Sequence, residues 1–380
     1  MTRREFIGAS VAGVGAAAGV AIAVALRGSN PSARPPVPSS AIPSPTSPPG
    51  SRTLKALIRG CLDRGGASAI PSGYRSSLAG YVPSSGGITG GVAWSAMQPT
   101  IGGPLAENNP IDQALVEVRS WNAANGAQQV LKVRVLAGIR SPAGAMTLGG
   151  GPVFLTDPVS GHSGNCPRFW SGAFGEVFYA FEALLVAEYD AVPEIAEIVL
   201  ARNMTFYAEP MIRQITSKAD VAALLAAGYG SALDEANQLS DIRARAVWRQ
   251  TRVAITLNPY QVINSDGTVT TDIGFTQEAI STGRSALGAQ AVLENNSYRQ
   301  DFLTGVGAYQ TMYGAMRAAS GPIGLQTATI DKVGDLSTVV AGAVALGATN
   351  VELPHGYSAD LTAAELGSDT SVLAANCPLC

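Results

Sequence analysis

Three apolar, strand-like runs of this chain carry a glutamate at or next to their end. The runs EIVLARNMTFYAEP, QAVLEN and TNVELP contain Glu209, Glu294 and Glu352. Enzymes built on parallel barrels place their chemistry at the C-terminal ends of the strands, where a carboxylate does nothing to build the barrel. Two carboxyl groups that face one cavity are the minimum equipment for cleaving a glycosidic bond. The three glutamates are therefore candidate catalytic residues.

Alternating strand and helix patterns predict the elements that must position these carboxylates. Repeated strand–helix units imply a parallel sheet, and a count near eight predicts an α/β fold of the (β/α)8 TIM-barrel type. The first strand is expected within 54–58 or 78–82. The other strands are expected at 91–98, 131–140, 195–209, 251–257, 289–294, 323–330 and 350–353. Helices are expected at 110–124, 169–189, 218–227, 231–246, 275–287, 301–320 and 335–346.

A doubly wound open sheet is the alternative fold. Such a sheet normally carries a glycine-rich phosphate loop between its first strand and a helix. The run Gly149-Gly150-Gly151 is followed by Pro152 and Val153 and by no helix pattern, so it is interpreted as a flexible loop. The barrel is therefore preferred.

In the barrel numbering, Glu209 ends the fourth strand, Glu294 the sixth and Glu352 the eighth. Strands two apart in such a barrel lie roughly 11 Å from each other, and strands four apart roughly 15 Å. Side chains from the fourth and sixth strands could close to the ~5.5 Å of a retaining glycosidase, and those from the fourth and eighth to the ~6.5–9.5 Å of an inverting one.

The tetrapeptide Tyr207-Ala208-Glu209-Pro210 resembles the Asn-Glu-Pro signature of clan A (β/α)8 glycoside hydrolases, with Ala208 in place of the Asn. The resemblance implies that Glu209 is the general acid/base. It also implies a nucleophile on the seventh strand, but that run has no carboxylate before Asp331. The second carboxylate is then Glu294, which is preferred, or Glu352.

Each glutamate also has a structural interpretation. Glu209 could cap a helix that begins at Pro210, since helix N-termini favour carboxylates. Glu294 could pair with Arg299, and Glu352 could pair with Arg140.

Polar and aromatic residues near the predicted strand ends are candidates for binding a sugar. Planar polar groups pair with hydroxyls, and rings stack on sugar faces. Each of these residues is individually more typical of a structural role. The candidates are Trp94, Gln98, Arg140, Asp157, Asn258, Tyr260, Asn295, Tyr298, Gln326 and His355.

Other chemistries are poorly supported. The chain has only two histidines, His162 and His355, so no metal site and no cofactor are predicted. The run Gly161-His162-Ser163-Gly164 is not the G-x-S-x-G elbow of a serine hydrolase. Besides a glycosidase, the residues leave open a non-catalytic carbohydrate- or wall-binding barrel, and less favourably another wall-associated hydrolase such as an esterase or lyase.

The N-terminus predicts export. Arg3 and Arg4 precede an uncharged apolar run, 6–26, as in a bacterial twin-arginine (Tat) signal peptide. Residues 1–27 are assigned to this signal or, if uncleaved, to an N-terminal membrane anchor. Residues 28–52 form a Pro/Ser-rich linker, and 53–380 the barrel domain. The predicted location is secreted or attached to the cell envelope.

Composition limits the partners. Charged residues make up 14% of the chain, the net charge is −3, and there is no Lys/Arg run, which argues against nucleic acid. The predicted partner is a carbohydrate. Four cysteines in an exported chain suggest two disulfides, and bridges from Cys377 and Cys380 back to Cys61 and Cys166 are preferred.

Overall fold

The computed structural model describes residues 53–64, 87–158, 160–207, 209, 215–357 and 360–376. The chain divides into two units, Met1–Pro45 and Thr46–Cys380, and every described residue belongs to the second. The predicted signal peptide and linker lie outside the described residues. Within the described part, no helix is long and apolar enough to span a bilayer.

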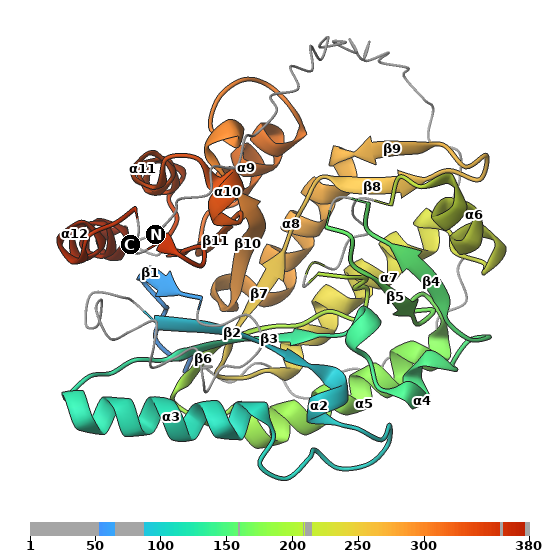
Figure 1. The fold of residues 1–380 in the computed structure, drawn as a ribbon, viewed down its shortest axis with the longest axis horizontal. Helices are drawn as coiled ribbons and strands as arrows, with labels where there is room; N and C mark the ends of the chain where they lie inside the picture. The colour runs from blue at the N-terminus through green and yellow to red at the C-terminus, as the bar shows by residue number, and fades with distance from the viewer. Residues whose placement is uncertain are drawn as a thin grey trace, which may run out of the picture. The chain divides into compact units, whose positions relative to one another are not determined.

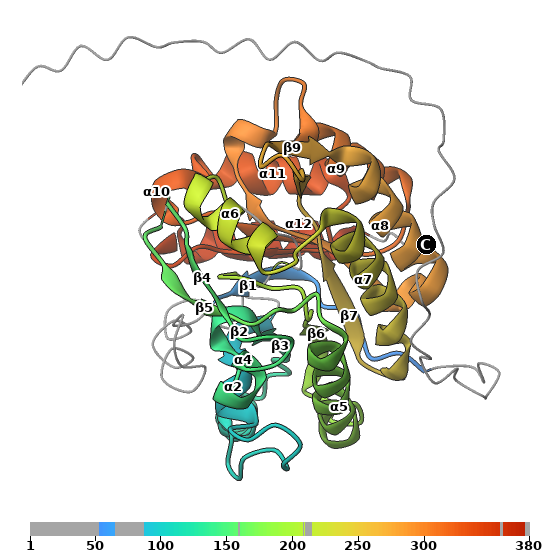
Figure 2. The same cartoon turned by 90° about the vertical axis from the view of Figure 1, so that its right-hand side faces the viewer.

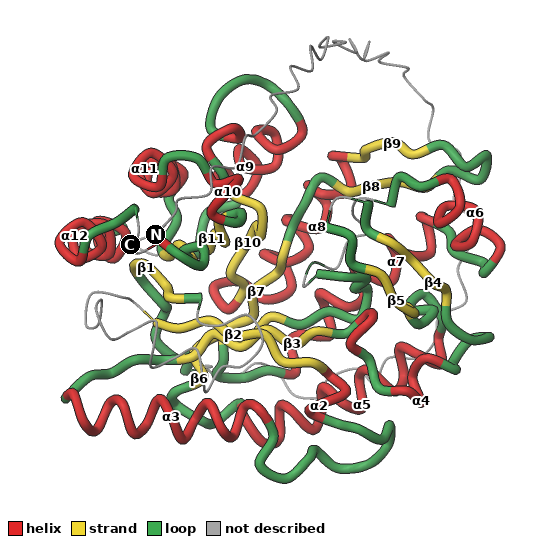
Figure 3. Tube along the Cα trace, viewed as in Figure 1, coloured by secondary structure: helices red, strands yellow, loops and turns green. Residues whose placement is uncertain are grey.

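Eight parallel strands form a closed barrel, which confirms the predicted (β/α)8 fold (Figures 1 and 3). They follow one another around the barrel in chain order, and the barrel closes where Gly60 of the first strand lies beside Asn350 of the last. The strands are β1 (Gly60–Asp63), β2 (Gly87–Ala93), β3 (Leu131–Leu136), β6 (Ile195–Val199), β7 (Arg252–Thr256), β10 (Ala291–Tyr298), β11 (Ile323–Thr327) and β12 (Asn350–Glu352).

Helices surround the barrel (Figure 2), and most begin at a residue that caps them. Asn109 and Thr362 form capping boxes, while the side chains of Ser171, Ser217 and Asp335 accept hydrogen bonds from the first turn. The longer helices are α3 (Pro110–Asn125), α5 (Gly172–Tyr189), α6 (Lys218–Ala226), α7 (Ser231–Ala244), α8 (Ile273–Leu287), α9 (Ala308–Ala318), α11 (Leu336–Leu346) and α12 (Ala363–Ala375). The short ones are α2 (Trp94–Met97), α4 (Ala143–Met146), α10 (Ile330–Val333), and the 3₁₀ turns η1 (Gly138–Arg140), η2 (Arg245–Val247), η3 (Gly288–Gln290) and η4 (Gln300–Phe302).

Two antiparallel hairpins extend the loops at the C-terminal ends of the strands. One is β4 (Val153–Thr156) with β5 (Ser163–Cys166), after β3; the other is β8 (Tyr260–Ile263) with β9 (Val269–Asp272), after β7. Helix α6 lies near both, at the right of Figure 1. The backbone N–H of Thr156 donates to Asp220 of α6 at 3.1 Å. The hairpins therefore form a supported wall beside the barrel opening.

The first strand lies just beyond the predicted range 54–58, and the other range, 78–82, is outside the described residues. Residues 54–58 instead close the N-terminal end of the barrel. Ile58 packs with Leu62 and Ala196, and Lys55 Nζ donates to the carbonyls of Val192 at 2.6 Å and Ile195 at 2.8 Å. Of these five residues only Ile58 is buried, so the run covers the barrel end through Ile58 and Lys55 without pairing as a strand.

Three predicted strands were too long. β2 ends at Ala93 because Trp94 begins α2, β3 ends at Leu136, and β6 ends at Val199. After β3, Gly138 has φ 57°, and a Cβ there would lie 2.1 Å from the carbonyl oxygen of Thr205. The chain therefore turns at a position where only glycine fits.

The predicted disulfides are not present in this structure. Cys61 and Cys166 are both free and buried, while Cys377 and Cys380 lie outside the described residues. Burial raises the pKa of the Cys61 thiol to about 12. Such a thiol stays protonated at neutral pH and packs as a small apolar group.

Candidate active site

The barrel interior contains a cluster of buried charges centred on β3. Lys132 and Arg134 alternate with Val133 and Val135, and the valines belong to the main apolar core. Because side chains alternate across a strand, the two cations point the other way, into the barrel. The Lys132 side chain is fully buried and the Arg134 side chain is 8% exposed.

Three carboxylates from three other strands surround these cations. Lys132 Nζ lies 2.8 Å from Glu197 Oε1 of β6 and 2.8 Å from Glu352 Oε1 of β12. It also forms an ion pair with Glu294 of β10. All three glutamate side chains are fully buried.

Glu294 and Glu352 meet at Arg134. Its Nη2 lies 2.9 Å from Glu294 Oε1 and 2.8 Å from Glu352 Oε1, so these two oxygens are at most about 5.7 Å apart. Glu352 is the last residue of β12, as predicted. Glu294 lies inside β10, which continues to Tyr298, so it is deeper in the barrel than a strand-end residue. The sequence-based partners, Arg299 for Glu294 and Arg140 for Glu352, were wrong, because the cations come from β3.

Glu352 and Glu197 differ in how easily they ionise. Burial opposes ionisation of Glu352, but Arg134 and Lys132 outweigh it and lower its pKa to about 2. For Glu197, burial dominates over the attraction of Lys132 and raises its pKa. Burial also disfavours the charge on Lys132, yet the surrounding glutamates raise its pKa. The cluster therefore holds Glu352 ionised and leaves Glu197 as a carboxyl that favours a proton.

Sequence reasoning missed Lys132, Arg134 and Glu197. Alternating charged and apolar residues in LKVRVL are also typical of a strand with one solvated face. In a closed barrel both faces are buried, so the same alternation marks an ionic interior. The available signal for this ionic interior was that Lys132 and Arg134 lie in the middle of a predicted barrel strand.

A second polar layer lies above this cluster at the end of β1. Arg64 Nη2 donates to the Thr327 carbonyl at 2.5 Å and to its hydroxyl at 3.0 Å. The hydroxyl of Tyr357 donates to Asp63 at 3.2 Å. His355 lies at the surface, and its partial burial together with the charge of Arg64 lowers its pKa. Gln326 pairs in register with Glu352 and is half-buried, which places it in the same layer.

Glu209 does not end a strand, because β6 stops at Val199 and Glu209 lies in the loop that follows. It is 9% exposed, and its charge contributes to the raised pKa of Tyr207, for which burial is the larger cause. The Tyr207 hydroxyl donates to Asp157 and lies 2.9 Å from Ser160 Oγ. Asp157 thus links the β4–β5 hairpin to the loop that carries Glu209.

His162 completes this turn without forming a catalytic triad. Its Nδ1 lies 3.0 Å from Ser160 Oγ, while Asp157 accepts from Ser160 itself. Asp157 therefore orients the serine and not the imidazole, whereas a triad needs its carboxylate on the histidine.

Most other predicted binding residues have structural contacts. Asn295 Nδ2 donates to the Leu257 carbonyl at 2.7 Å and to Asn258 Oδ1 at 3.0 Å. Tyr260 donates to Asp234 of α7 at 3.1 Å, and the Tyr298 ring meets Tyr313 edge-on. All four predicted residues are at most 1% exposed. They shape the wall of the opening and offer little surface to a ligand.

Trp94 and Gln98 lie in the layer between barrel and helices. Trp94 is fully buried and stacks on Phe181 of α5 with ring centroids 5.0 Å apart. Its Nε1 donates to Gln98 Oε1 at 3.1 Å, and Gln98 donates onward to Gly103. Arg140 is exposed at the end of η1. The structure brings none of these three together with the charged cluster.

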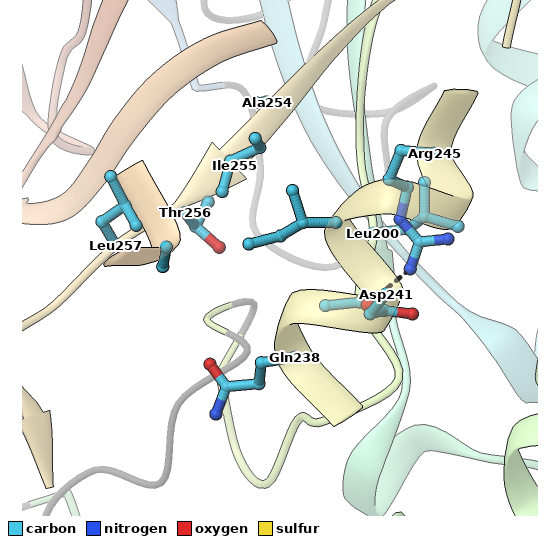
Figure 4. A pocket seen from close by; sticks show the side chains of 11 residues that line it. Leu200, Gln238, Asp241, Arg245, Ala254, Ile255, Thr256 and Leu257 are labelled. Atoms are coloured by element: carbon cyan, nitrogen blue, oxygen red, sulfur yellow. Dashed lines mark hydrogen bonds and ion pairs between the residues drawn. The ribbon is translucent and has the colours of Figure 1, made fainter. Parts of the chain in front are cut away.

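A small cavity lies outside the barrel, between the ends of β6 and β7 and the helices α7 and α8 (Figure 4). Its volume is about 20 Å³, which suits about one water molecule. Arg245 Nη2 and Asp241 Oδ2 form an ion pair of 2.7 Å at its edge. The cavity is too small for a sugar. Within the described residues, no three His, Cys, Asp or Glu side chains form a group that could hold a metal.

No protein-family model matches the chain, and no curated protein sequence is detectably similar to it. Endoglucanase Cel5A of Pseudomonas stutzeri superposes with a TM-score of 0.46 and 11% identity over 86% of this chain and 98% of that one. The β-mannanase of Thermomonospora fusca gives 0.39 and 10% over 83% and 88%. Morphinone reductase gives 0.39 and 14% over 80% and 83%. Because all three TM-scores are below 0.5, these similarities carry no argument about chemistry, and the barrel assignment stands on its strand pairing.

Proposed function

We propose that this protein is an exported glycoside hydrolase acting on a polysaccharide or oligosaccharide at the C-terminal ends of its barrel strands. The observation that carries the proposal is that Glu294 and Glu352 both bind Nη2 of Arg134. Glu294 Oε1 and Glu352 Oε1 are therefore at most about 5.7 Å apart. Closely spaced carboxyl groups held by a cation can supply the ionised carboxylate that a glycosidase needs beside a separate general acid.

In the proposed mechanism Glu352 is the ionised carboxylate that faces the anomeric carbon. It ends its strand, and Arg134 and Lys132 lower its pKa to about 2, so it stays charged over the whole working range. An ionised carboxylate can attack the sugar or stabilise an oxocarbenium-like transition state. Glu294 supports it from deeper in the barrel.

Glu209 is the proposed general acid. Its low exposure, 9%, supports this role, because a general acid has to be shielded from bulk water while it protonates the leaving oxygen. Tyr207 and Asp157 hold the loop on which it lies. Proton donation to the leaving oxygen contributes about 10²–10⁴-fold to such reactions.

A specific observation also favours a second candidate, a carbohydrate-binding barrel without catalysis. Both Glu294 and Glu352 are fully buried and neutralised by cations, which suits a structural ion cluster as well as a reacting pair. In that case the polar upper layer would bind sugars, and no carboxylate would react.

The test is a screen of aryl glycosides and bacterial cell-wall polysaccharides with purified protein, followed by Glu209→Gln and Glu352→Gln. We expect each substitution to reduce kcat at least about 100-fold while sugar binding persists. Glu194→Gln is the matched control, since Glu194 precedes β6 at the opposite end of the barrel and forms a 2.8 Å ion pair with exposed Arg119. Binding without hydrolysis by the unmodified protein would establish the second candidate instead.

A further inference from the structure

The turn between β4 and β5 is held by hydrogen bonds whose donors can be assigned one by one. Ser160 Oγ carries a single hydrogen, and its shortest contact is with a carboxylate oxygen of Asp157, which can only accept. The Ser160 hydroxyl therefore donates to Asp157. Nδ1 of His162 lies 3.0 Å from the same Oγ, so the hydrogen of that second bond has to come from the imidazole.

This assignment fixes the tautomer of His162. A neutral imidazole carries one ring hydrogen, and the hydrogen bond made by one nitrogen decides which of the two nitrogens holds it. With the hydrogen on Nδ1, a lone pair is left on Nε2. His162 is exposed, and its Nε2 has no hydrogen-bond partner among the described residues. The hairpin therefore presents a hydrogen-bond acceptor at its surface.

Contacts around the turn hold this imidazole in place. The backbone N–H of buried Asp157 donates to the His162 carbonyl at 2.7 Å, and the His162 N–H donates to Ser160 Oγ at 3.2 Å. The Tyr207 ring meets the imidazole edge-on, with ring centroids 6.3 Å apart. An acceptor that is already oriented loses little conformational freedom when it binds a ligand.

The acceptor lies beside the loop of the proposed general acid. Tyr207, which contacts the His162 ring and donates to Asp157, precedes Glu209 by two residues. Burial is the larger cause of the raised pKa of Tyr207, and the charge of Glu209 adds to it, so the carboxyl group lies near the ring. A sugar chain bound at Glu209 is therefore within reach of His162.

We propose that His162 Nε2 accepts a hydrogen bond from a hydroxyl of a sugar bound beside Glu209. The proposal rests on the proposed function and adds a substrate-binding residue to it. Hydroxyls are the donors that a neutral sugar offers, whereas a carboxylate has no hydrogen to give. The subsite therefore selects a sugar unit with a free hydroxyl at this position over one with a carboxylate there.

Nitrogen NMR tests the tautomer without any assay of activity. The chain has two histidines, so protein with nitrogen-15 in its imidazoles gives two sets of ring resonances, and His355→Gln assigns them. At about pH 8, where an ordinary imidazole is neutral, we expect His162 in its Nδ1–H form. Ser160→Ala removes the acceptor of that hydrogen, so the Nε2–H form that free histidine prefers should return. Ser371→Ala, at an exposed serine of α12, is the matched control and should leave the tautomer unchanged.

Calorimetry then tests the contact with sugar. The probes are cellohexaose, mannohexaose, laminarihexaose and xylohexaose, titrated into the Glu209→Gln variant so that no probe is hydrolysed. We expect at least one probe to bind and to move the Nε2 resonance of His162 to lower frequency, as happens when a ring nitrogen accepts a hydrogen bond.

Two substitutions separate the roles of the two ring nitrogens. His162→Asn keeps a donor near the position of Nδ1 but has no acceptor at that of Nε2, so it should weaken probe binding at least about fivefold. His162→Gln places an amide near the position of Nε2 and should bind within about threefold of the original. Thermal unfolding checks that each variant is folded. The tautomer and the ligand-induced shift need no substitution at position 162, so they decide the question even where a variant fails to fold.

Three results would each overturn the inference: an Nε2–H tautomer of His162 in the unmodified protein, failure of every probe to bind, or binding by folded His162→Asn within about twofold of the original. Hydrolysis of an aryl glycoside or a cell-wall polysaccharide alongside any of these results would leave the proposed function intact. Binding through His162 without hydrolysis by the unmodified protein would retain the inference and reject catalysis.

Discussion

Lys132 shows how much one residue can determine inside a closed barrel. Its ammonium group meets carboxylates from β6, β10 and β12 and has no contact with solvent. A buried ion cluster gives little net stability compared with an apolar core, but removing one partner leaves the others uncompensated. Replacing Lys132 should therefore lower the stability of the fold, although the residue lies away from the barrel opening.

We expect Lys132→Met to lower the free energy of unfolding by about 3–5 kcal/mol, because three buried carboxyl groups lose their shared cation. Urea denaturation followed by circular dichroism measures this. Arg119→Met is the matched control: Arg119 pairs with Glu194 at 2.8 Å on the surface, and its loss should change stability by less than about 1 kcal/mol. Equal effects of the two substitutions would contradict a central role for the cluster.

The candidate site could be predicted only in part at this scale. Glu352 was placed correctly at a strand end, because a short apolar run followed by Pro354 marks its position. Its cations could not be predicted, since Lys132 and Arg134 lie more than half the chain away and each resembles a surface residue locally. Pairing among eight strands decides which charges meet, and no local pattern encodes it.

Among the elements, α7 carries a second buried polar centre that the sequence did not indicate. Asp234, in its first turn, accepts hydrogen bonds from Asn203 at 2.5 Å, Tyr229 at 2.9 Å, and Tyr260 and Gln238 at 3.1 Å. These donors tie the β6 loop and the β8–β9 hairpin to α7. Burial nevertheless outweighs these hydrogen bonds and raises the pKa of Asp234 to about 6.

The raised pKa of Asp234 predicts a pH dependence of stability. Between about pH 4 and 6 the unfolded chain has released this proton while the folded protein still holds it, so stability falls as pH rises through that window. The contribution is about 3 kcal/mol, from a shift of roughly two pKa units. We expect Asp234→Asn to flatten the dependence of urea midpoints on pH.

Exposed Glu278 of α8 provides the control for that measurement. Glu278→Gln should leave the slope of stability against pH between about 4 and 6 close to that of the unmodified protein. An unchanged slope in Asp234→Asn would show that other groups cause the dependence.

Helices were the most predictable elements. The bounds of most of the expected helices fell within three residues of the prediction, but α9 begins at Ala308 instead of 301, and α12 was not predicted. Periodic apolar positions and caps such as Asn109 and Asp335 are local signals. The hairpins β4–β5 and β8–β9 were not predicted, because each is a short excursion inside a loop and packs through α6 and α7. The end of β6 was misplaced because the apolar residues Met204 and Phe206 continue the strand-like pattern into the loop.

At the scale of the whole molecule, seven recognisable strands alternating with helices predicted the barrel, while the first strand, β1, lies just beyond the range 54–58 in which it was sought. Export is predicted from residues 1–27, which lie outside the described part of the chain. We expect Arg3→Lys with Arg4→Lys to retain the protein inside the cell, because the Tat receptor reads the arginine pair. Cell fractionation and immunoblotting measure the distribution.

Arg34→Lys, in the predicted linker, is the control for export and should not alter the distribution. Export of the double variant at the normal level would reject the twin-arginine assignment and favour another route through the membrane.

Barrel closure joins the two ends of the domain, since Gly60 of β1 lies beside Asn350 of β12. The last strand also supplies Glu352 to Lys132 and Arg134, which the ribosome synthesises much earlier. A nascent chain that stops before residue 350 would leave Lys132 and Arg134 enclosed with too few anions and β1 without its neighbour. For a protein proposed to be translocated already folded, completion of synthesis then becomes a requirement for leaving the cell, and prematurely terminated products would remain behind for proteolysis.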